Sequence, residues 1–437
     1  MKLKASLAIA FGLLAGMAHS ATDLVIATVN NRQMIEMQSL TKYFEEANPD
    51  IKLKWVTLEE GVLRARVATD ISTKGGQFDV MTIGMYETPF WSKKGWLKEI
   101  KPDANYDIDD LLPPIRAGLS YEGKLYAAPF YGESSFTMYR TDLAKEVGAE
   151  VPEQPTWDQI RDFAAKVHNP AKGMYGICLR GKPGWGDNMA LLSTVINTYG
   201  GQWFDMDWKP QIDSKPWKDG ISFYVDLMNK YGPPGATANS FNENLALFAE
   251  GKCGIWVDAT SAGGSVSDPK FSKVGDKIAF VKAPTAVTPK GSSWLWSWAL
   301  AIPAGTKKEE AAQKFINWAT SKEYVKLVAK VDGWIVVPTG NRSSTYDYPE
   351  YQKVSRFGEM ERKSILQTNP NDQTLLKSPY TGVQFAAIPE FQSIGIAVGQ
   401  QISAALAGKI TVDAALKAGQ LAAEREMKKA GYYKKAK

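Results

Sequence analysis

The chain has almost no histidine or cysteine, with two residues of each among 437. Protein zinc sites and many other transition-metal sites draw their ligands from these side chains, so we expect no metal and no other cofactor. The motifs G-x-S-x-G, H-E-x-x-H and the glycine-rich P-loop are also missing. Their absence excludes the most easily recognised hydrolase, metalloprotease and nucleotide-binding sites.

Neither sign of charge dominates, because 52 Lys and Arg stand against 47 Asp and Glu, a net charge of +5. A nucleic-acid binder usually concentrates basic residues on one face, and here only the C-terminal tail is basic. We interpret that tail as a solvated end. After the first twenty residues, no stretch is long and apolar enough to span a membrane. We therefore expect neither nucleic acid nor the membrane interior as a partner.

The first twenty residues have the pattern of an export signal. Lys2 and Lys4 precede the apolar run 5–18, and Ala18 and Ser20 are small residues at the positions that define a cleavage site. The run is too short for a membrane anchor, which takes about 20 residues. We predict a signal peptide at 1–20 and an exported, soluble mature protein.

Aromatic residues are abundant, with 14 Trp, 18 Tyr and 17 Phe. They supply enough apolar surface for stable cores, which excludes an intrinsically disordered chain. At roughly 100–200 residues per domain, the length predicts two lobes or domains.

Apolar runs and amphipathic stretches alternate along the chain. Strands are expected at 24–27, 51–55 and 78–83, with helices between them. This order predicts an α/β fold with a mainly parallel sheet covered by helices. The pattern resumes after Gly148 without a disordered linker, so we expect two α/β units that share a cleft.

Three helix starts carry capping boxes, in which a Ser or Thr is followed three residues later by Gln or Glu. The boxes begin at Thr156, Ser240 and Thr306. Two Ala-rich helices are expected at 392–407 and 411–430.

The residues that follow the predicted strands are the candidates for a binding site, because ligands of open α/β sheets bind outside the carboxyl ends of the strands. These positions and their neighbours carry Tyr86, Glu87, Tyr131, Glu133, Arg180, Trp185, Asn188, Asp258, Trp294, Trp296 and Trp334. Charged groups make strong hydrogen bonds to hydroxyls, and aromatic faces cover C–H surface and exclude water. The mixture predicts a site for a sugar or polyol.

Several of these residues also fit a purely structural role. Trp294, Trp296 and Trp298 recur with period two, so they share one strand face, which suits a buried aromatic ladder as well as a binding face. Arg180 could form a surface ion pair. Trp334 follows Gly333 in a loop, which favours a binding role.

Cys178 and Cys253 lie in or next to short predicted strands. Export would permit a disulfide between them, which requires Cα atoms within about 7 Å. Two buried free cysteines fit the sequence equally well.

Several short segments, in this order and after an export signal, resemble family 1 of the extracellular solute-binding proteins of ABC importers, which includes maltose-binding protein. The segments are LTKYFE at 40–45, NP at 48–49, FDV at 78–80, GKLYAAP at 123–129, MYRTDL at 138–143, PTWD at 155–158, FAEGK at 248–252 and AQKFINW at 312–318. They cover essentially the whole mature chain. Within the family, the chain is most similar to the sorbitol- and mannitol-binding proteins.

The resemblance implies the type II periplasmic-binding-protein fold, in which a hinge joins two lobes around a ligand cleft. The implied lobe bounds are 21–133 and 286–335 for the N-terminal lobe, and 134–285 and 336–437 for the C-terminal lobe. The chain is expected to cross between the lobes near 133–136, near 281–284 and after Trp334.

The implied function is transport. The mature protein, a monomer, would capture a sugar alcohol (sorbitol, mannitol or arabitol) by lobe closure and deliver it to the membrane subunits of an ABC permease. The resemblance implies neither a chemical reaction nor a cofactor.

The resemblance also carries over to single residues. Glu133 falls where the maltose-binding relative uses a Glu on its sugar. Tyr86 and Glu87 fall in the first-lobe contact loop of that family. Trp185 falls in its aromatic loop, and Asp258 at its second-lobe turn.

Arg180 departs from the maltose pattern, and a compact cation there favours a short, linear, hydroxyl-rich ligand. The sequence does not rank the polyols, and a binder of mono- or oligosaccharides in the same family is an alternative. A secreted glycoside hydrolase is a second alternative. It would need two carboxyl groups about 5–9.5 Å apart, for which Glu133 and Asp258 are candidates, but the order of the segments favours a binder.

Overall fold

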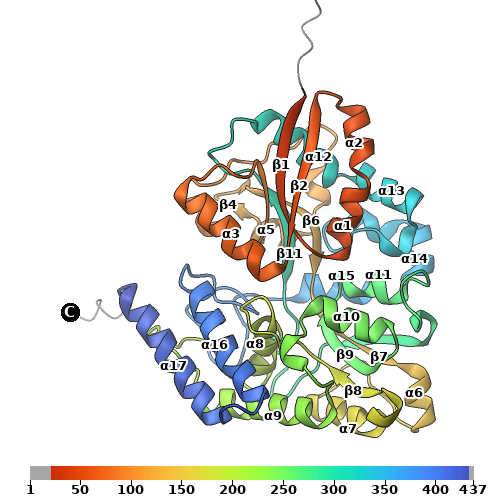
Figure 1. The fold of residues 1–437 in the computed structure, drawn as a ribbon, viewed down its shortest axis with the longest axis vertical. Coiled ribbons are helices and arrows are strands. Elements are labelled where there is room, and N and C mark those ends of the chain that lie inside the picture. The colour runs from red at the N-terminus through yellow and green to blue at the C-terminus, as the bar shows by residue number, and fades with distance from the viewer. Residues whose placement is uncertain (1–20, 433–437) are drawn as a thin grey trace, which may run out of the picture.

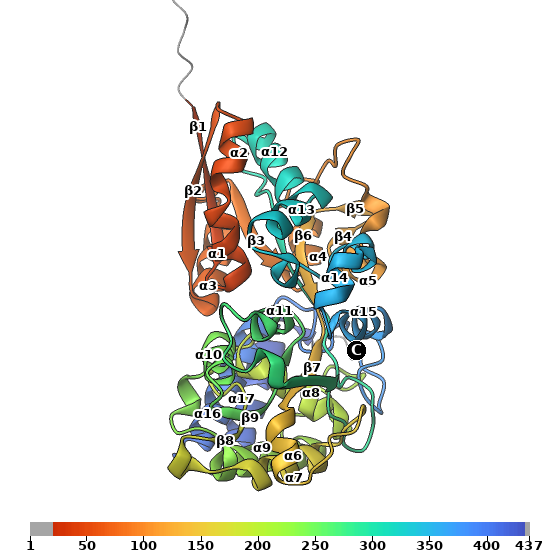
Figure 2. The ribbon, with the colours of Figure 1, turned by 90° about the vertical axis from the view of Figure 1, so that its right-hand side faces the viewer.

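The structure is a computed structural model that describes residues 21–432, and the predicted export signal lies outside this range. The chain forms two lobes that follow one another along the long axis of the molecule (Figures 1 and 2). Each lobe has a β-sheet covered by helices. The predicted two-lobe α/β fold is confirmed.

A five-stranded sheet in the order β2–β1–β3–β11–β6 forms the centre of the first lobe. Its strands are β1 (Thr22–Val29), β2 (Ile51–Leu58), β3 (Val80–Gly84), β6 (Ala127–Glu133) and β11 (Trp296–Ala301). A small hairpin, β4 (Ser120–Tyr121) and β5 (Lys124–Leu125), lies beside it. The helices of this lobe are α1 (Arg32–Ser39), α2 (Thr41–Ala47), α3 (Glu60–Thr73), α4 (Glu87–Lys93), α5 (Pro113–Gly118), α12 (Glu309–Ala319) and α13 (Lys322–Val331).

The second lobe has a four-stranded sheet in the order β10–β7–β9–β8. Its strands are β7 (Ser135–Arg140), β8 (Tyr175–Cys178), β9 (Cys253–Ala259) and β10 (Ile278–Lys282). Its helices are α6 (Thr141–Glu146), α7 (Trp157–Val167), α8 (Asn188–Thr198), α9 (Lys215–Tyr231), α10 (Phe241–Ala249), α11 (Ala262–Ser267), α16 (Phe391–Leu406) and α17 (Val412–Lys429). The remaining helices, α14 (Pro349–Val354) and α15 (Gly358–Gln367), lie near the level where the lobes meet (Figure 2).

The prediction of a mainly parallel sheet is confirmed for β1, β2 and β3, the strands from which it was made, and is wrong for the second lobe, where most neighbouring strands are antiparallel. β1 is parallel to β2 and β3, and β8 is parallel to β9. The other pairs, β3–β11, β11–β6, β10–β7 and β7–β9, are antiparallel. The physical reason is the crossing of the chain between lobes. β6 runs out of the first lobe directly into β7, whereas β11 returns from β10, so these strands run in opposite directions.

Two of the three predicted capping boxes are confirmed. Thr156 and Ser240 each cap a helix, α7 and α10, with reciprocal side-chain bonds. The box at Thr306 is wrong, since α12 begins only at Glu309. The Thr306 hydroxyl donates instead to Asp79 Oδ1 at 2.7 Å, a partner on another part of the chain that sequence spacing does not reveal.

The segment after Trp334 is bonded to the first lobe. The backbone N–H of Gly132 donates to the Thr339 carbonyl, and that of Leu112 donates to the Asn341 carbonyl. Arg342 is fully buried and bonds to Asp110 at 3.2 Å. These contacts hold the chain against the strand that leads out of the lobe.

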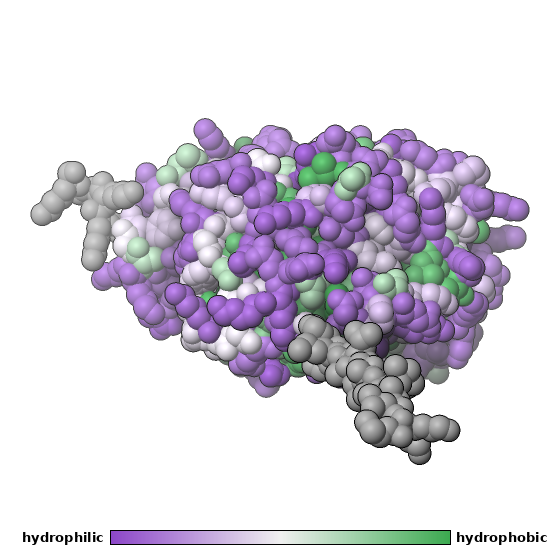
Figure 3. All heavy atoms as spheres, turned by 90° about the horizontal axis from the view of Figure 1, so that it is seen from above, coloured by the Kyte–Doolittle hydropathy of each residue, from purple (hydrophilic) through white to green (hydrophobic). Residues whose placement is uncertain are grey.

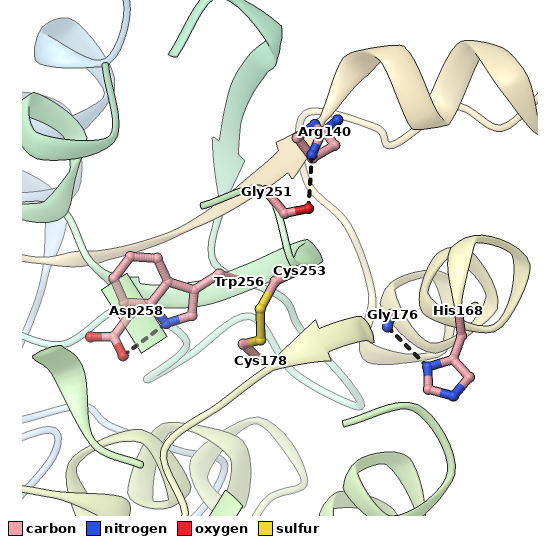
Figure 4. The surroundings of a disulfide bond; sticks show 8 residues. All are labelled: Arg140, His168, Gly176, Cys178, Gly251, Cys253, Trp256 and Asp258. Atoms are coloured by element: carbon pink, nitrogen blue, oxygen red, sulfur yellow. Dashed lines mark hydrogen bonds between the residues drawn. A yellow bond between two sulfur atoms is a disulfide. The ribbon is translucent and has the colours of Figure 1, made fainter. Parts of the chain in front are cut away.

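Cys178 and Cys253 form a disulfide that joins β8 to β9, with 5.9 Å between the Cα atoms (Figure 4). This decides between the two alternatives that the sequence left open. Cys178 and Cys253 are both fully buried, beside Trp256 in the core of the second lobe.

Seen along the long axis, the surface is mostly hydrophilic, with hydrophobic residues in small separate groups (Figure 3). No helix between residues 21 and 432 combines the length and the apolar character needed to cross a membrane. Within the same range, no cluster of three or more His, Cys, Asp or Glu side chains has an arrangement that could hold a metal ion.

Candidate functional site

A cavity of about 80 Å³ lies between the two lobes. Since one ordered water needs roughly 10–15 Å³, this space accepts a molecule about as large as a small cluster of waters. Its first-lobe lining comprises Val29, Asn30, Asn31, Glu59, Glu60, Arg64, Tyr131, Glu133, Trp294, Trp296 and Trp298. The rest of the lining is Arg180, Lys182, Trp185, Gly186, Asp187, Ala190, Ser240, Phe241, Asn242, Glu243, Ser261 and Gln384.

Six of the eleven predicted site residues line this cavity. They are Tyr131, Glu133, Arg180, Trp185, Trp294 and Trp296. All six are more than nine-tenths buried. The tryptophans therefore fit both a buried aromatic ladder and a binding face, since the indoles are packed in the core and also form the cavity wall.

Arg180 is fixed to Asp258 by two parallel hydrogen bonds. Its Nε and Nη2 donate to the two carboxylate oxygens at 2.9 and 2.6 Å, and Nη1 donates to the Gly186 carbonyl at 2.8 Å. Burial works to lower the pKa of Arg180, but the Asp258 carboxylate outweighs it and raises the pKa above its usual value. Asp258 also accepts from the indole of Trp256 at 3.2 Å (Figure 4). Asp258 is fully buried behind Arg180, which it supports, and does not line the cavity.

Glu133 ends β6 at the point where the chain leaves the first lobe. The Ser261 hydroxyl of the second lobe donates to it at 2.6 Å. Burial raises the pKa of Glu133 to about 8, and the nearby carboxylates of Asp258 and Glu60 add to the rise, while Ser261 and Arg180 oppose it. Glu133 therefore offers the cavity a carboxyl group without an ion-pair partner of its own.

The other four predicted site residues do not line the cavity. The Tyr86 hydroxyl donates to the Ile388 carbonyl at 2.9 Å. Glu87 accepts from Arg64 and from the backbone N–H of Gly84.

Asn188 and Trp334 are also engaged elsewhere. Asn188 donates to the Gly399 carbonyl at 2.9 Å. Trp334 packs against Tyr348 at 4.8 Å between ring centroids. Their side chains turn to a backbone group or a ring that sequence spacing does not show.

Arg64 is a lining residue that the sequence did not indicate. It donates to Glu60 at 2.8 Å and to Glu87 at 3.0 Å. In the sequence, Glu60 and Arg64 form an ordinary helical i, i+4 pair, which usually lies on the surface. The structure buries Arg64 to 6% exposure, under tryptophans from distant segments. No local signal could have found it.

Asp187 and Lys182 were also missed, although both lie in the loop that carries Trp185. Lys182 reaches across the cleft to Glu59 at 2.5 Å. Burial and the Glu60 carboxylate raise the pKa of Asp187 to about 6, against the hydroxyl of Ser240 that donates to it. The loop therefore contributes a carboxyl group to the cavity and a cross-lobe ion pair.

The lobes also touch beside the cavity. Arg32 of α1 forms an ion pair with Asp268 of the second lobe, and its guanidinium lies 4.7 Å from the Phe271 ring centroid. Asn242 donates to the Asn30 carbonyl at 2.8 Å. The molecule is thus in a closed conformation.

Comparison with known proteins agrees with this geometry. Residues 31–326 match the model of a family described as bacterial extracellular solute-binding protein. A mannitol-binding protein of Pseudomonas aeruginosa is 53% identical over 433 residues, 99% of each chain. A solute-binding protein of Agrobacterium vitis, solved with bound D-mannitol, is 59% identical with a TM-score of 0.93, over 94% of this chain and 99% of that one.

More distant structures share the architecture. A solute-binding protein of Agrobacterium radiobacter in complex with ribitol is 25% identical, with a TM-score of 0.82 over 93% of this chain and 99% of that one. A maltose-bound protein of T. maritima, 18% identical, has the same fold, with a TM-score of 0.77 over 93% and 100% of the two chains. The family resemblance seen in the sequence is confirmed, and the chain belongs to the bacterial extracellular solute-binding proteins.

Proposed function

We propose that the mature protein is the periplasmic substrate-binding component of an ABC importer and that it captures a sugar alcohol, mannitol in the first place. The observation that carries this proposal is the small cavity with one buried arginine from each lobe, Arg64 and Arg180. Two relatives that share more than half of the sequence are a mannitol-binding protein and a protein solved with D-mannitol. Sorbitol and arabitol, with similar hydroxyl chains, are the next candidates.

The size of the cavity supports a short ligand over an oligosaccharide. About 80 Å³ is too small for two linked sugar rings unless the lobes separate. Closure around a short ligand lets groups of both lobes contact it at once, and this differential contact favours the closed form.

The cavity gives little support to the glycoside hydrolase alternative. That mechanism needs two carboxyl groups on either side of the ligand. Asp258, the expected partner of Glu133, is buried behind Arg180 and bonded to it through both oxygens. Binding without a reaction fits this arrangement better.

As ligand contacts we propose the six predicted residues that line the cavity, together with Arg64 and Asp187. Asp258 and Glu87 would support the two arginines from behind. Tyr86, Asn188 and Trp334 would act on the shape of the molecule and not on the ligand.

The remaining assignments follow from the family. We propose that the first twenty residues direct export, that the monomer works in the periplasm and that the closed form docks on the membrane subunits of an ABC permease. For the lobes we keep 21–133 with 286–335 and 134–285 with 336–437, with two refinements. Residues 336–354 are assigned to the first lobe because of the bonds from Gly132 and Leu112, and 286–290 to the second because Val287 donates to the Thr198 carbonyl.

Thermal unfolding of the mature protein with mannitol, sorbitol, arabitol, glucose, fructose and maltose tests the proposal. A ligand at a hundred times its dissociation constant adds about 2.7 kcal/mol to the free energy of unfolding. We expect a clear rise of Tm with mannitol and none with maltose. A rise of Tm with maltose alone would contradict the proposal. So would the absence of a rise with any of the polyols.

A further inference from the structure

The tryptophan faces of the cavity are occupied by arginine. The guanidinium carbon of Arg64 lies 4.0 Å from the ring centroid of Trp185, 4.5 Å from that of Trp298 and 4.9 Å from that of Trp296. These distances are well inside the roughly 6 Å range of cation–π contacts. One buried cation therefore covers three of the four lining indoles.

The guanidinium of Arg180 covers the fourth lining indole, that of Trp294. Its guanidinium carbon lies 5.4 Å from the Trp294 centroid and 5.6 Å from that of Phe241. Neither arginine is free to swing away, because Arg64 is held by Glu60 and Glu87, and Arg180 by Asp258.

The ring of Trp185 is also surrounded by other aromatic rings. Tyr86 packs on it at 4.8 Å between centroids, Trp296 at 5.8 Å and Phe391 at 6.0 Å. A flat sugar ring normally rests its C–H face on such an indole. In this cavity that face is already covered.

The edges of the indoles, in contrast, are left with unused donors. The Nε1 atoms of Trp185 and Trp294 are buried and have no hydrogen-bond partner among the described residues. An arginine has five N–H donors, and three hydrogen bonds are made by Arg64 and three by Arg180. The cavity therefore offers fixed N–H donors, and the carboxyl groups in its lining, among them Glu133 and Asp187, offer acceptors.

We infer that this site selects acyclic polyols against cyclic sugars of the same size, and that Arg64 is the residue that determines the selection. The inference rests on the proposed function and names how the same site discriminates. A hexitol and a hexopyranose have the same number of heavy atoms, so volume alone does not separate them. A hexitol chain turns a hydroxyl to every side, and each hydroxyl both accepts from an indole or guanidinium N–H and donates to a carboxyl group. A pyranose ring finds no open aromatic face here.

Calorimetric titration with D-mannitol and with methyl mannopyranoside, whose ring cannot open, tests the inference. We expect the native protein to bind mannitol tighter by on the order of a hundredfold, as for sites built around hydrogen bonds to charged groups. Arg64→Met removes the cation and its donors while keeping a side chain of similar length, and it exposes the indole faces. Mannitol affinity should fall by about tenfold to a hundredfold, and the ratio of the two affinities should shrink.

Arg66→Met is the matched control. Arg66 lies on the same helix and packs on an aromatic ring, Phe78, at 5.5 Å, but it is exposed and does not line the cavity. Its loss should leave both affinities and their ratio unchanged. A role of Arg64 in folding alone would weaken both ligands equally, so the ratio separates the two explanations.

Native protein that binds the mannopyranoside as tightly as mannitol would overturn the inference, as would an unchanged ratio in Arg64→Met. If that variant does not fold, Arg64→Lys gives the answer, because lysine keeps the charge but lacks the planar fork. An unchanged ratio there would also overturn the inference. Failure of the proposed function looks different, since the native protein would then bind no polyol at all.

Discussion

The first-lobe and second-lobe sides of the cavity each present one buried arginine, but they hold it in different ways. Arg64 is held by Glu60 one helical turn away on α3 and by Glu87 at the start of α4. Arg180 follows the short edge strand β8 and is held by Asp258 on β9, and these two strands are joined by a disulfide. The first arrangement needs mainly local structure, whereas the second depends on the exact pairing of two distant segments. This difference predicts that the second-lobe side is the more easily disturbed.

The largest effect is expected from Asp258→Ala. It leaves Arg180 buried without its partner, and breaking a buried ion pair in this way costs about 3–5 kcal/mol. Urea unfolding of the variant should show this loss of stability, together with weaker mannitol binding in calorimetry. Glu60→Ala is the comparison, because Arg64 keeps Glu87 and should lose much less. Equal losses for the two variants would remove the asymmetry between the two sides.

A second prediction concerns the bridge between β8 and β9 (Figure 4). Replacing both Cys178 and Cys253 by Ala removes a constraint on a long loop and should cost about 2–4 kcal/mol. Because Arg180 comes two residues after Cys178, mannitol affinity should fall as well. The fall should vanish when the replacement is made in an Arg180→Ala background. If the bridge and Arg180 contribute independently to affinity, the disulfide only stabilises the fold.

The contacts between the lobes allow a third comparison. Arg32 is only 27% exposed and pairs with Asp268, which is 4% exposed, whereas the pair of Lys182 and Glu59 is 31% and 46% exposed. Exposed ion pairs contribute about 0–1 kcal/mol. Arg32→Ala should therefore speed mannitol release by roughly fivefold to tenfold, more than Lys182→Ala. Stopped-flow tryptophan fluorescence measures both rates, and a larger effect of Lys182→Ala would contradict the closed geometry described above.

A fourth prediction concerns the pH dependence of stability. Burial raises the pKa of Glu133 from 4.5 to about 8, so the folded form without ligand binds more protons than the unfolded chain between these values. The contribution of this group to stability is present below about pH 4.5 and is lost as the pH rises toward 8. Glu133→Gln removes the titration, so its Tm relative to the native protein should rise between pH 5 and pH 8. The difference in Tm between the two proteins is the quantity to follow, because other buried carboxyl groups, such as Asp187, titrate in the same direction in both proteins. A constant difference in Tm would contradict the raised pKa.

Much of the fold was predictable from local patterns. β1, β2 and α3 have the apolar spacing and breaks that predict a strand or a helix, and two capping boxes mark true helix starts. The direction of β11 was not predictable, because it depends on how the chain returns from the other lobe. Thr306 failed as a cap for a similar reason, since its partner Asp79 is distant in the sequence.

In the binding site, too, local patterns predicted some features and not others. Position after a strand predicted Glu133, Arg180 and Trp185 for the site, and all three line the cavity. It predicted Asn188 as well, although its side chain bonds to the Gly399 carbonyl. Being near a cleft and pointing into it are different properties, and only the second depends on which backbone groups need a partner.

By itself, the amino-acid sequence determined the α/β class, the two lobes, the family and the kinds of residue that meet at the cleft. These follow from local periodicity, from strand ends and from the order of short segments, all of which are properties of neighbouring residues. Only the tertiary structure decided that Arg64 is buried, that its cation covers three indoles and that Asp258 lies behind Arg180. The physical reason is that burial and side-chain direction are set by contacts between segments far apart in the chain, which no local pattern records.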